Sequence, residues 1–306
     1  MKRKSDLALG SWQFGPSHGF WTGQTTQESL FTIRTALKVG LFHFDTAPAY
    51  GNGLAEQLLG SVLSQAANRE SILIDTKFMP KQPNLIERDV QKSLNRLKSP
   101  YIDTLYLHWP NSKLDMRPIL QSAVQLIEQG TVRHLGLSNT PLSLLDTLLQ
   151  EFPIEFLQIP CSLVWTRGLE DYKQYAQEQN ISLVGYSPLG LGLLSGRYRK
   201  KPEDSRGNLY VFKDTAITIY HELLALLASL AEKKPCSMAQ IALAWARSQD
   251  FATILVGARN PEQLKALMET DTINLDEEEK RGLDEMAERL NACAPQSWDN
   301  LFGHRW

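Results

Sequence analysis

Residues 42–78 read FHFDTAPAYGNGLAEQLLGSVLSQAANRESILIDTKF, and this stretch holds a strand pattern, a helical pattern and a second strand pattern. Short apolar runs of strand type cover Phe42–Thr46 and Ile72–Phe78. Between them, Leu54–Gln65 has its apolar residues at helical spacing. A short strand, a helix and another short strand are typical of a βα unit, so the stretch predicts part of a parallel sheet.

The same alternation continues along nearly the whole chain. Strands are predicted at Leu7–Trp12, Phe42–Thr46, Ile72–Phe78, Ile102–Trp109, Val132–Ser138, Phe156–Pro160, Ile181–Ser187 and Thr253–Gly257. Helices are predicted at Gln27–Lys38, Leu54–Gln65, Leu85–Lys98, Arg117–Gln129, Leu142–Glu151, Leu169–Gln179, Met238–Ser248 and Pro261–Glu269, with two extra helices at Thr215–Lys233 and Glu277–Ala292. Eight such units favour one α/β domain over residues 1–306, a closed (β/α)₈ TIM barrel rather than an open doubly wound sheet.

Composition narrows the classes of partner. The 306 residues carry a net charge of −2 and a pI near 6.3, which gives no electrostatic reason to expect nucleic acid or an anionic membrane. No apolar run approaches the length of a membrane span, and the basic first residues are not followed by the apolar segment of a signal peptide. The cysteines, Cys161, Cys236 and Cys293, have no disulfide or metal-site spacing. We expect a cytoplasmic protein without a metal.

Reactive side chains follow several of the predicted strands. In such barrels, catalytic groups lie where the strands end and the βα loops begin. Asp45 ends the second strand and is followed by Tyr50, Lys77 ends the third, and His108 ends the fourth. Further polar groups end the later strands: Ser138-Asn139, Gln158, Tyr186-Ser187-Pro188 and Gly257-Ala258-Arg259. A carboxylate, a phenol, an amine and an imidazole are therefore expected to converge.

This set suits the reduction of a carbonyl by a nicotinamide, which needs a proton for the developing alkoxide. A Lys77 ammonium about 4 Å from Tyr50 would lower the pKa of the phenol by at most about three units. Asp45 would keep Lys77 protonated but would offset part of that effect, so we expect a smaller net lowering. His108 can donate a hydrogen bond to the carbonyl oxygen. Alternatively, Lys77 could form a Schiff base, as in an aldolase.

The chain resembles the aldo-keto reductase family in these same segments. The matching motifs are Phe44-Asp45-Thr46-Ala47-Pro48-Ala49-Tyr50-Gly51 with Glu56 and Leu59-Gly60, then Thr76-Lys77, then Leu107-His108-Trp109-Pro110. Matches extend from Leu9-Gly10-Ser11-Trp12 to Gly257-Ala258-Arg259. The resemblance implies that Asp45, Tyr50, Lys77 and His108 form a catalytic tetrad in which Tyr50 donates the proton.

The resemblance also implies NADPH, stretched across the barrel mouth. Ser138, Asn139 and Gln158 match residues that hold the carboxamide, and Tyr186 matches the aromatic residue that stacks on the nicotinamide. Arg197, and after it Arg206, would balance the pyrophosphate charge. The full implied set is Ser11, Trp12, Asp45, Ser138, Asn139, Gln158, Tyr186, Ser187, Pro188, Leu189, Gly190, Gly192, Arg197, Gly257, Arg259 and Gln263.

Arg259 opens a segment, Gly257-Ala258-Arg259-Asn260-Pro261-Glu262-Gln263, that leads into a helix. The unpaired amides of a helix start are a natural anion site, and an arginine there favours the 2′-phosphate of NADPH over NADH. The family often has Glu-Asn three and four residues after this Gln, whereas the chain has Ala266 and Leu267. Contacts to the adenine end are therefore predicted to differ.

The expected substrate is a small aldehyde or ketone in an aromatic pocket. Trp12 and Trp109 are the predicted pocket residues, and Phe20 and Trp21 are further candidates. The C-terminal tail, with Trp298, Phe302, His304 and Trp306, is expected near the barrel mouth, although it could pack on the barrel or a neighbouring subunit. A second reading is a non-enzymatic NADPH-binding redox sensor, resembling the β-subunits of potassium channels. The oligomeric state stays open.

Overall fold

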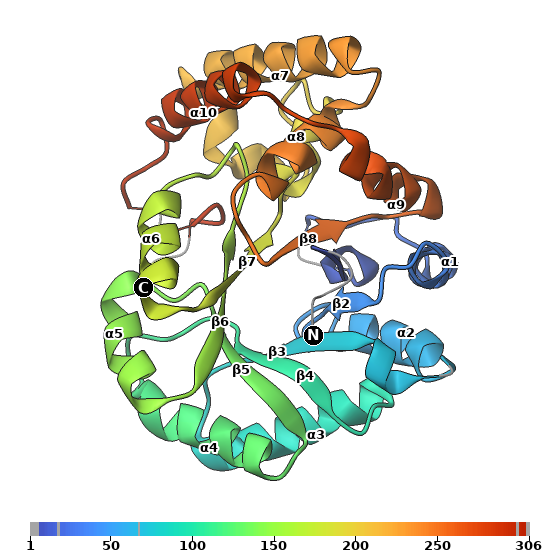
Figure 1. The fold of residues 1–306 in the computed structure, drawn as a ribbon, viewed down its shortest axis with the longest axis vertical. Helices are drawn as coiled ribbons and strands as arrows, with labels where there is room; N and C mark the ends of the chain where they lie inside the picture. The colour runs from blue at the N-terminus through green and yellow to red at the C-terminus, as the bar shows by residue number, and fades with distance from the viewer. Residues whose placement is uncertain (1–5, 17–18, 67, 298–299, 304–306) are drawn as a thin grey trace.

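The structure is a computed structural model that describes residues 6–16, 19–66, 68–297 and 300–303. Eight parallel strands follow one another around a closed barrel in chain order (Figure 1). They are β1 Leu7–Gly10, β2 His43–Asp45, β3 Leu73–Phe78, β4 Ile102–Leu107, β5 Val132–Ser138, β6 Ile154–Pro160, β7 Ser182–Tyr186 and β8 Thr253–Gly257. The predicted (β/α)₈ barrel is confirmed.

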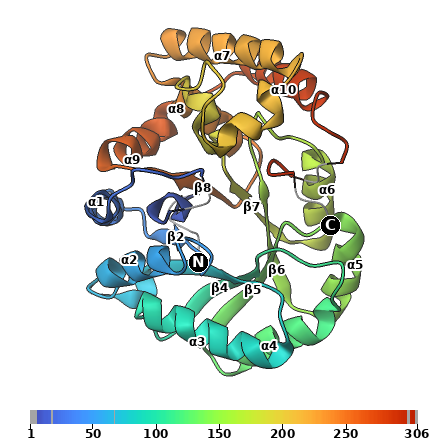
Figure 2. The same cartoon turned by 180° about the vertical axis from the view of Figure 1, so that it is seen from behind.

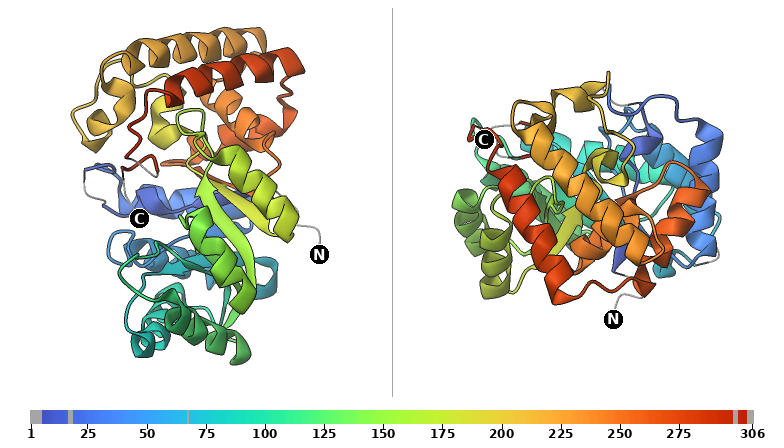
Figure 3. Two further views of the ribbon diagram at one scale, coloured as in Figure 1. Left: turned by 90° about the vertical axis from the view of Figure 1, so that its left-hand side faces the viewer. Right: turned by 90° about the horizontal axis from the view of Figure 1, so that it is seen from above.

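The helices lie outside the barrel (Figures 1 and 2). Those of the βα repeat are α1 Thr26–Lys38, α2 Leu54–Leu63, α3 Ile86–Leu97, α4 Met116–Glu128, α5 Leu142–Glu151, α6 Leu169–Gln179, α8 Met238–Arg247 and α9 Pro261–Met268. The two extra helices, α7 Ala216–Lys233 and α10 Glu277–Asn291, run side by side across one end of the molecule (Figure 3). Trp245 Nε1 on α8 donates to Asp284 on α10 over 2.6 Å, which ties this extra layer to the barrel helices.

β1 is shorter than the sequence predicts. It ends at Gly10, and Trp12–Phe14 form a short 3₁₀ turn, η1. The backbone N–H of Ser11 donates to the carbonyl oxygen of Asp45 over 3.0 Å, after which the chain leaves the ladder. Trp12 therefore begins a loop at the carboxyl end of the barrel rather than ending a strand.

The barrel interior has an apolar half and a polar half. Side chains alternate between the two faces of a strand, so residues two apart share a face. Ala8, Val184 and Leu255 form one inner cluster, with Phe156 and Tyr186 packed against it. On the other side of the interior, Asp45 of β2 lies opposite Asp75 of β3. Lys77 of β3 lies opposite Tyr106 of β4. The charged groups of β2 and β3 thus share one part of the interior.

The amino-terminal end of the barrel carries an ionic cluster. Arg69 donates to the buried carboxylate of Asp103 over 2.7 Å, and Asp103 also accepts from the backbone N–H of Ile74 over 2.9 Å. The guanidinium carbons of Arg69 and Arg133 lie 4.1 and 3.7 Å from the centre of the Tyr101 ring. These groups satisfy one another, so this end of the barrel has a structural role.

Across the part of the chain that the structure describes, no helix combines the length and apolar character needed to cross a lipid bilayer. In the same residues, no three His, Cys, Asp or Glu side chains gather as metal ligands.

Gly136 on β5 faces the Tyr106 ring so closely that an added Cβ would overlap ring carbons. We expect Gly136→Ala to lower the free energy of unfolding by about 1–3 kcal/mol, because the overpacked ring has to shift. Urea unfolding measures this. The matched control is Gly282→Ala on α10, where the nearest atom to the new Cβ is 4.0 Å away and a slight stabilisation is expected. Equal effects in the two variants would contradict the tight packing around Tyr106.

Candidate active site

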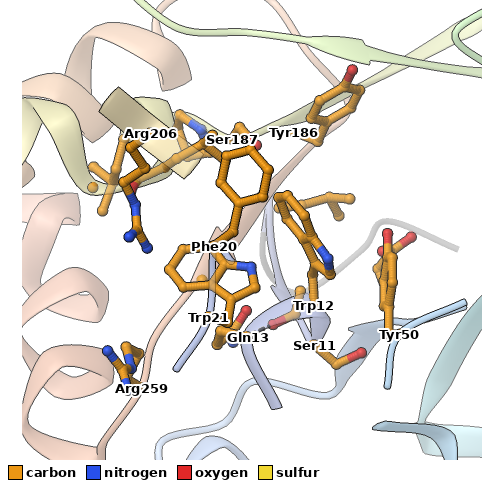
Figure 4. A pocket seen from close by; sticks show the side chains of 18 of the residues that line it. Ser11, Trp12, Gln13, Phe20, Trp21, Tyr50, Tyr186, Ser187, Arg206 and Arg259 are labelled. Atoms are coloured by element: carbon orange, nitrogen blue, oxygen red, sulfur yellow. Dashed lines mark hydrogen bonds between the residues drawn. The ribbon is translucent and has the colours of Figure 1, made fainter. Parts of the chain in front are cut away.

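One continuous cavity of about 680 Å³ opens at the carboxyl ends of the strands. Its volume falls within the range of about 300–1,000 Å³ that is usual for ligand pockets. Figure 4 shows its lining, with Tyr50 and Tyr186 at one end, Arg206 and Arg259 toward the other, and Trp12, Phe20 and Trp21 between them. This is the end of the barrel at which the sequence places the chemistry.

A buried ion pair lies beneath one end of the cavity. Lys77 Nζ donates to Asp45 Oδ1 over 2.6 Å and to the carbonyl oxygen of Thr46 over 2.9 Å. The second carboxylate oxygen of Asp45 accepts from Gln158 Nε2 over 2.9 Å. Asp45 and Lys77 are each 2% exposed. Both oxygens of the carboxylate are therefore occupied, which limits the cost of burying its charge.

Tyr50 and His108 complete the predicted tetrad. Lys77 Nζ lies 5.2 Å from the centre of the Tyr50 ring, and the centres of the Tyr50 and His108 rings are 5.8 Å apart. Gly51 follows Tyr50 with a φ of +60°, and a Cβ at that position would lie 2.7 Å from the Cα of Gly15. Glycine is therefore required where the Tyr50 loop passes the loop after η1.

Burial controls the protonation of these groups. Burial raises the pKa of Tyr50 above its ordinary value, and the nearby Lys77 ammonium only partly counters it. The net lowering expected from the sequence is thus wrong, because sequence does not reveal how far the partly buried Tyr50 ring is desolvated by the loops around it. For Lys77, burial alone would lower the pKa, but the carboxylate of Asp45 outweighs it and the pKa is raised. Burial has the largest effect on His108, and the positive charge of Lys77 adds to it. Together they hold the pKa of His108 well below its ordinary value.

The protonation states follow. Near neutral pH, Tyr50 carries its phenolic proton, Lys77 is an ammonium and His108 is a neutral imidazole. A Schiff base needs a neutral amine that can reach a substrate. Lys77 is charged, buried and hydrogen-bonded to two oxygens, so the structure argues against the aldolase alternative.

The residues predicted to hold the carboxamide are already linked to one another. The Tyr186 hydroxyl donates to Asn139 Oδ1 over 2.6 Å, and Asn139 Nδ2 donates to the His108 carbonyl oxygen and to Ser138 Oγ over 3.0 and 2.9 Å. Gln158 instead donates to Asp45. The sequence did not predict these links, which join the expected nicotinamide site to the tetrad.

Arg206 is buried in the cavity wall and held by several partners, whereas Arg197 is exposed. Its guanidinium carbon lies 4.6 Å from the centre of the Trp21 ring, its Nε donates to the carbonyl oxygen of Leu191 over 3.0 Å, and it pairs with Asp204. Arg206 is 3% exposed, whereas Arg197 is exposed although it also lines the cavity. Burial and these partners fix Arg206 in the cavity wall, and which of the two arginines balances the pyrophosphate stays a prediction.

Two residues of the loop between β1 and α1 hold the side chain of Arg259 in place through hydrogen bonds. Its Nε donates to Gln24 Oε1 over 2.9 Å, and its NH2 group donates to the carbonyl oxygen of Thr22 over 2.6 Å. Both partners are neutral, so these bonds orient the guanidinium without cancelling its charge. Sequence reasoning missed Gln24, because nothing in its local pattern distinguishes it from other loop residues.

The start of α9 is a weaker anion site than the sequence predicts. Pro261 has no N–H, and the N–H of Gln263 donates to the Asn260 side chain over 2.9 Å. The side chain of Gln263 in turn accepts from the backbone N–H of Arg259 over 2.9 Å. Anion recognition at this end therefore falls mainly on the Arg259 guanidinium.

Most of the other predicted cofactor residues line the same cavity. Those at its surface are Ser11, Trp12, Asp45, Ser138, Asn139, Gln158, Tyr186, Ser187, Pro188, Leu189, Gly192, Arg197, Gly257, Arg259 and Gln263. Gly190 is the exception: it packs so closely on Val164 that a Cβ would lie 2.5 Å from its Cγ2. Ala266 and Leu267 also line the cavity, which makes the wall near Arg259 partly apolar.

Aromatic rings surround Trp12. Its ring centre lies 5.5 Å from those of Phe20 and Trp21, 5.6 Å from that of Phe302 and 6.3 Å from that of Tyr50. The predicted pocket residue Trp109 lies 6.4 Å from Phe302, so the C-terminal segment borders the pocket. The other tail residues named from the sequence, Trp298, His304 and Trp306, lie outside the described residues.

Comparisons with known proteins agree with this geometry. The sequence model of the Aldo/keto reductase family matches residues 6–288. The aldo-keto reductase YhdN of Bacillus subtilis is 30% identical, over 93% of this chain and 90% of that protein. The NADH-specific methylglyoxal reductase of Escherichia coli is 27% identical, over 94% and 95%.

Among solved structures, the glycerol dehydrogenase of Gluconobacter oxydans superposes with a TM-score of 0.82 at 29% identity, covering 93% of this chain and 92% of that one. The family match spans most of the chain, and the closed eight-stranded barrel agrees with it. The chain therefore belongs to the aldo/keto reductase family of oxidoreductases, which act on carbonyl and CH–OH groups.

Proposed function

We propose that this protein is an NADPH-dependent carbonyl reductase that reduces a small aldehyde or ketone, with Tyr50 as the proton donor. The observation that carries the proposal is the arrangement around Tyr50. The Lys77–Asp45 ion pair lies under the Tyr50 ring, and the His108 ring lies beside it at the cavity wall.

Each group has a separate task in that reaction. A bound dihydronicotinamide supplies the hydride for the carbonyl carbon. Tyr50 holds the proton that the developing alkoxide takes, and the Lys77 ammonium stabilises the phenolate that remains. The neutral His108 ring can donate an N–H hydrogen bond to the carbonyl oxygen. Asp45 keeps Lys77 charged throughout.

The cavity suits a long dinucleotide. It runs without interruption from Tyr50 to Arg259, past Arg206. Two buried polar atoms of residues in its lining, Ser11 Oγ and Trp21 Nε1, have no hydrogen-bond partner in the part of the chain that the structure describes. Unsatisfied buried groups of this kind are costly, so their presence in the lining supports a polar ligand.

Family membership does not fix the choice between NADPH and NADH, since the Escherichia coli relative is named NADH-specific. The preference for NADPH rests on the Arg259 guanidinium, which two neutral hydrogen-bond partners orient, with the Glu28 carboxylate near enough to act on its charge. The aromatic rings at the other end favour an apolar carbonyl compound. The free thiols Cys161, Cys236 and Cys293 support a reducing compartment such as the cytoplasm.

We expect Tyr50→Phe to bind NADPH normally but to lose about 10²–10⁴-fold in kcat, because only the transferable proton is removed. Nicotinamide absorbance with 4-nitrobenzaldehyde measures turnover, and cofactor fluorescence measures binding. The matched control is Tyr175→Phe, a tyrosine whose hydroxyl bonds the surface residue Asp146. Turnover in Tyr50→Phe equal to that of the control would contradict the assigned donor. A wild-type protein that binds NADPH but turns over no aldehyde or ketone would instead favour the redox-sensor reading.

The pH dependence of reduction follows from the raised pKa of Tyr50. The donor must be protonated, so activity is present below its pKa and is lost as the pH rises through it. Because that pKa lies above the usual value of about 10, we expect kcat/KM for reduction to stay level up to about pH 9 and to fall only above about pH 10. A decline centred between about pH 7 and 8 would show that another group limits the reaction.

Arg259→Ala should weaken NADPH binding by about 10–100-fold and change NADH binding little, because only NADPH offers a 2′-phosphate to the guanidinium. Titration with each cofactor measures both dissociation constants. Arg117→Ala removes an exposed arginine that pairs with Asp115 and serves as the control. Equal losses for NADPH and NADH would place the 2′-phosphate elsewhere.

A further inference from the structure

The part of the barrel interior beneath the tetrad is charged. Barrels of this kind are usually filled with branched apolar side chains. Here Asp75 lies opposite Asp45 in the β2–β3 ladder, and His43 Nε2 lies 2.7 Å from Asp75 Oδ2. His43 is 4% exposed and Asp75 1%. A second acid and its histidine are thus buried directly against the acid of the tetrad.

Another buried acid, Glu56, has a structural role and can be compared with Asp75. Glu56 on α2 accepts from Thr76 Oγ1 over 2.7 Å and from Arg96 Nε over 2.6 Å. Thr76 points away from the barrel interior, because it alternates with Lys77. Glu56 is therefore neutralised by an arginine outside the barrel and joins the strand to two helices. Asp75 differs, because it shares the inner face with Lys77 and lies across the ladder from Asp45.

We propose that Asp75 and His43 are positioning residues of the active site, which set the charge state of Asp45 and through it the ammonium of Lys77. Asp75 places a second negative charge beside Asp45 and opposes its ionisation. His43 holds that carboxylate in place, because its Nε2 lies 2.7 Å from Asp75 Oδ2. The pair matters to turnover only if Tyr50 is the donor proposed above, but its effect on Asp45 does not depend on turnover.

The charges around Asp45 shift its pKa in known directions. Burial raises the pKa of Asp45 most, Lys77 lowers it, and the like charge of Asp75 raises it further. The titratable groups of the described residues that share the inner face or line its mouth come from five strands and the loops. They are His43 and Asp45 on β2, Asp75 and Lys77 on β3, Tyr106 on β4, His134 on β5, Tyr186 on β7, and Tyr50, His108, Arg197, Tyr198, Arg206 and Arg259 in the loops. Of these, Lys77 and Asp75 are the charges that act on Asp45.

Asp45 connects the pair to the chemistry. As the pH falls through the pKa of Asp45, its carboxylate is neutralised and Lys77 loses its counter-charge. The Lys77 ammonium is then no longer fixed at 2.6 Å from an anion beneath Tyr50. We therefore expect the acid limb of the pH–rate profile to follow Asp45 and to move with Asp75 and His43.

The test measures the pKa of Asp45 directly. Carbon NMR of protein labelled at the aspartate carboxyl carbon follows the titration, and the Asp45 signal is identified by its loss in Asp45→Asn. Asp75→Asn should lower the pKa of Asp45, because it removes the like charge that opposes the ionisation of Asp45. His43→Gln keeps a hydrogen-bond donor toward Asp75 and should leave the pKa of Asp45 close to that of the wild type. His43→Ala releases the Asp75 carboxylate from its 2.7 Å contact and should lower the pKa of Asp45, as Asp75→Asn does.

The double variant Asp75→Asn/His43→Ala should behave like Asp75→Asn alone, because His43 acts on Asp45 only through Asp75. The acid limb of kcat/KM should shift in the same directions as the NMR values. His134→Gln is the control, since its ring bonds the partly exposed Glu155 over 2.8 Å and should leave Asp45 unchanged.

An Asp45 that titrates identically in wild type, Asp75→Asn and His43→Ala would overturn the proposal and leave the pair a packing contact. A raised pKa of Asp45 in Asp75→Asn would also overturn it. If Asp75→Asn fails to fold by circular dichroism, the shift of Asp45 in His43→Ala, compared with His43→Gln, decides. A wild-type protein without reductase activity would remove the proposed function, while the NMR titration would still decide the role of the pair.

Discussion

The ion pair between Asp45 and Lys77 is the interaction on which the site depends. Two opposite charges are held 2.6 Å apart, almost completely out of water, where an unpaired charge would be very costly. Gln158 and the Thr46 carbonyl take the remaining hydrogen-bonding positions. Removing either partner of such a pair typically costs about 3–5 kcal/mol, because the other charge remains buried. The fold must therefore place β2, β3 and β6 accurately before any chemistry is possible.

Stability and reactivity lie at opposite ends of the barrel. At the amino-terminal end, Arg69 and Asp103 satisfy each other, which gives that end a structural role. At the carboxyl end, the side chains come from loops and strand ends and enclose a large cavity. The loop after β1 contributes to both halves of that cavity. It brings Trp12 beside Tyr50 and Gln24 beside Arg259, so one loop couples the substrate end to the cofactor end.

The order of the strands and the meeting of Asp45, Tyr50, Lys77 and His108 at the barrel mouth could be predicted, because the strand patterns and the residues that follow them are local in sequence. Alternating apolar periods locate the eight strands, and Asp45, Lys77 and His108 stand at the predicted strand ends. The side-chain contacts could not be predicted in the same way. The bond from Gln158 to Asp45 and the pair of His43 with Asp75 depend on which strands become neighbours and in what register. Burial of the Tyr50 hydroxyl, which reverses the expected direction of its pKa change, depends on loops that pack only after the barrel closes.

The central claim is that a phenol, an ammonium and an imidazole act on one carbonyl oxygen while hydride reaches the carbonyl carbon. The most direct measurement supplies NADPH deuterated at C4, on each face in turn, together with 4-nitrobenzaldehyde, and analyses the alcohol by mass spectrometry. The account predicts that one of the two labelled cofactors delivers deuterium to the carbinol carbon in step with cofactor consumption. Alcohol formed without deuterium from either cofactor, or no alcohol formed by protein that binds NADPH, would contradict it.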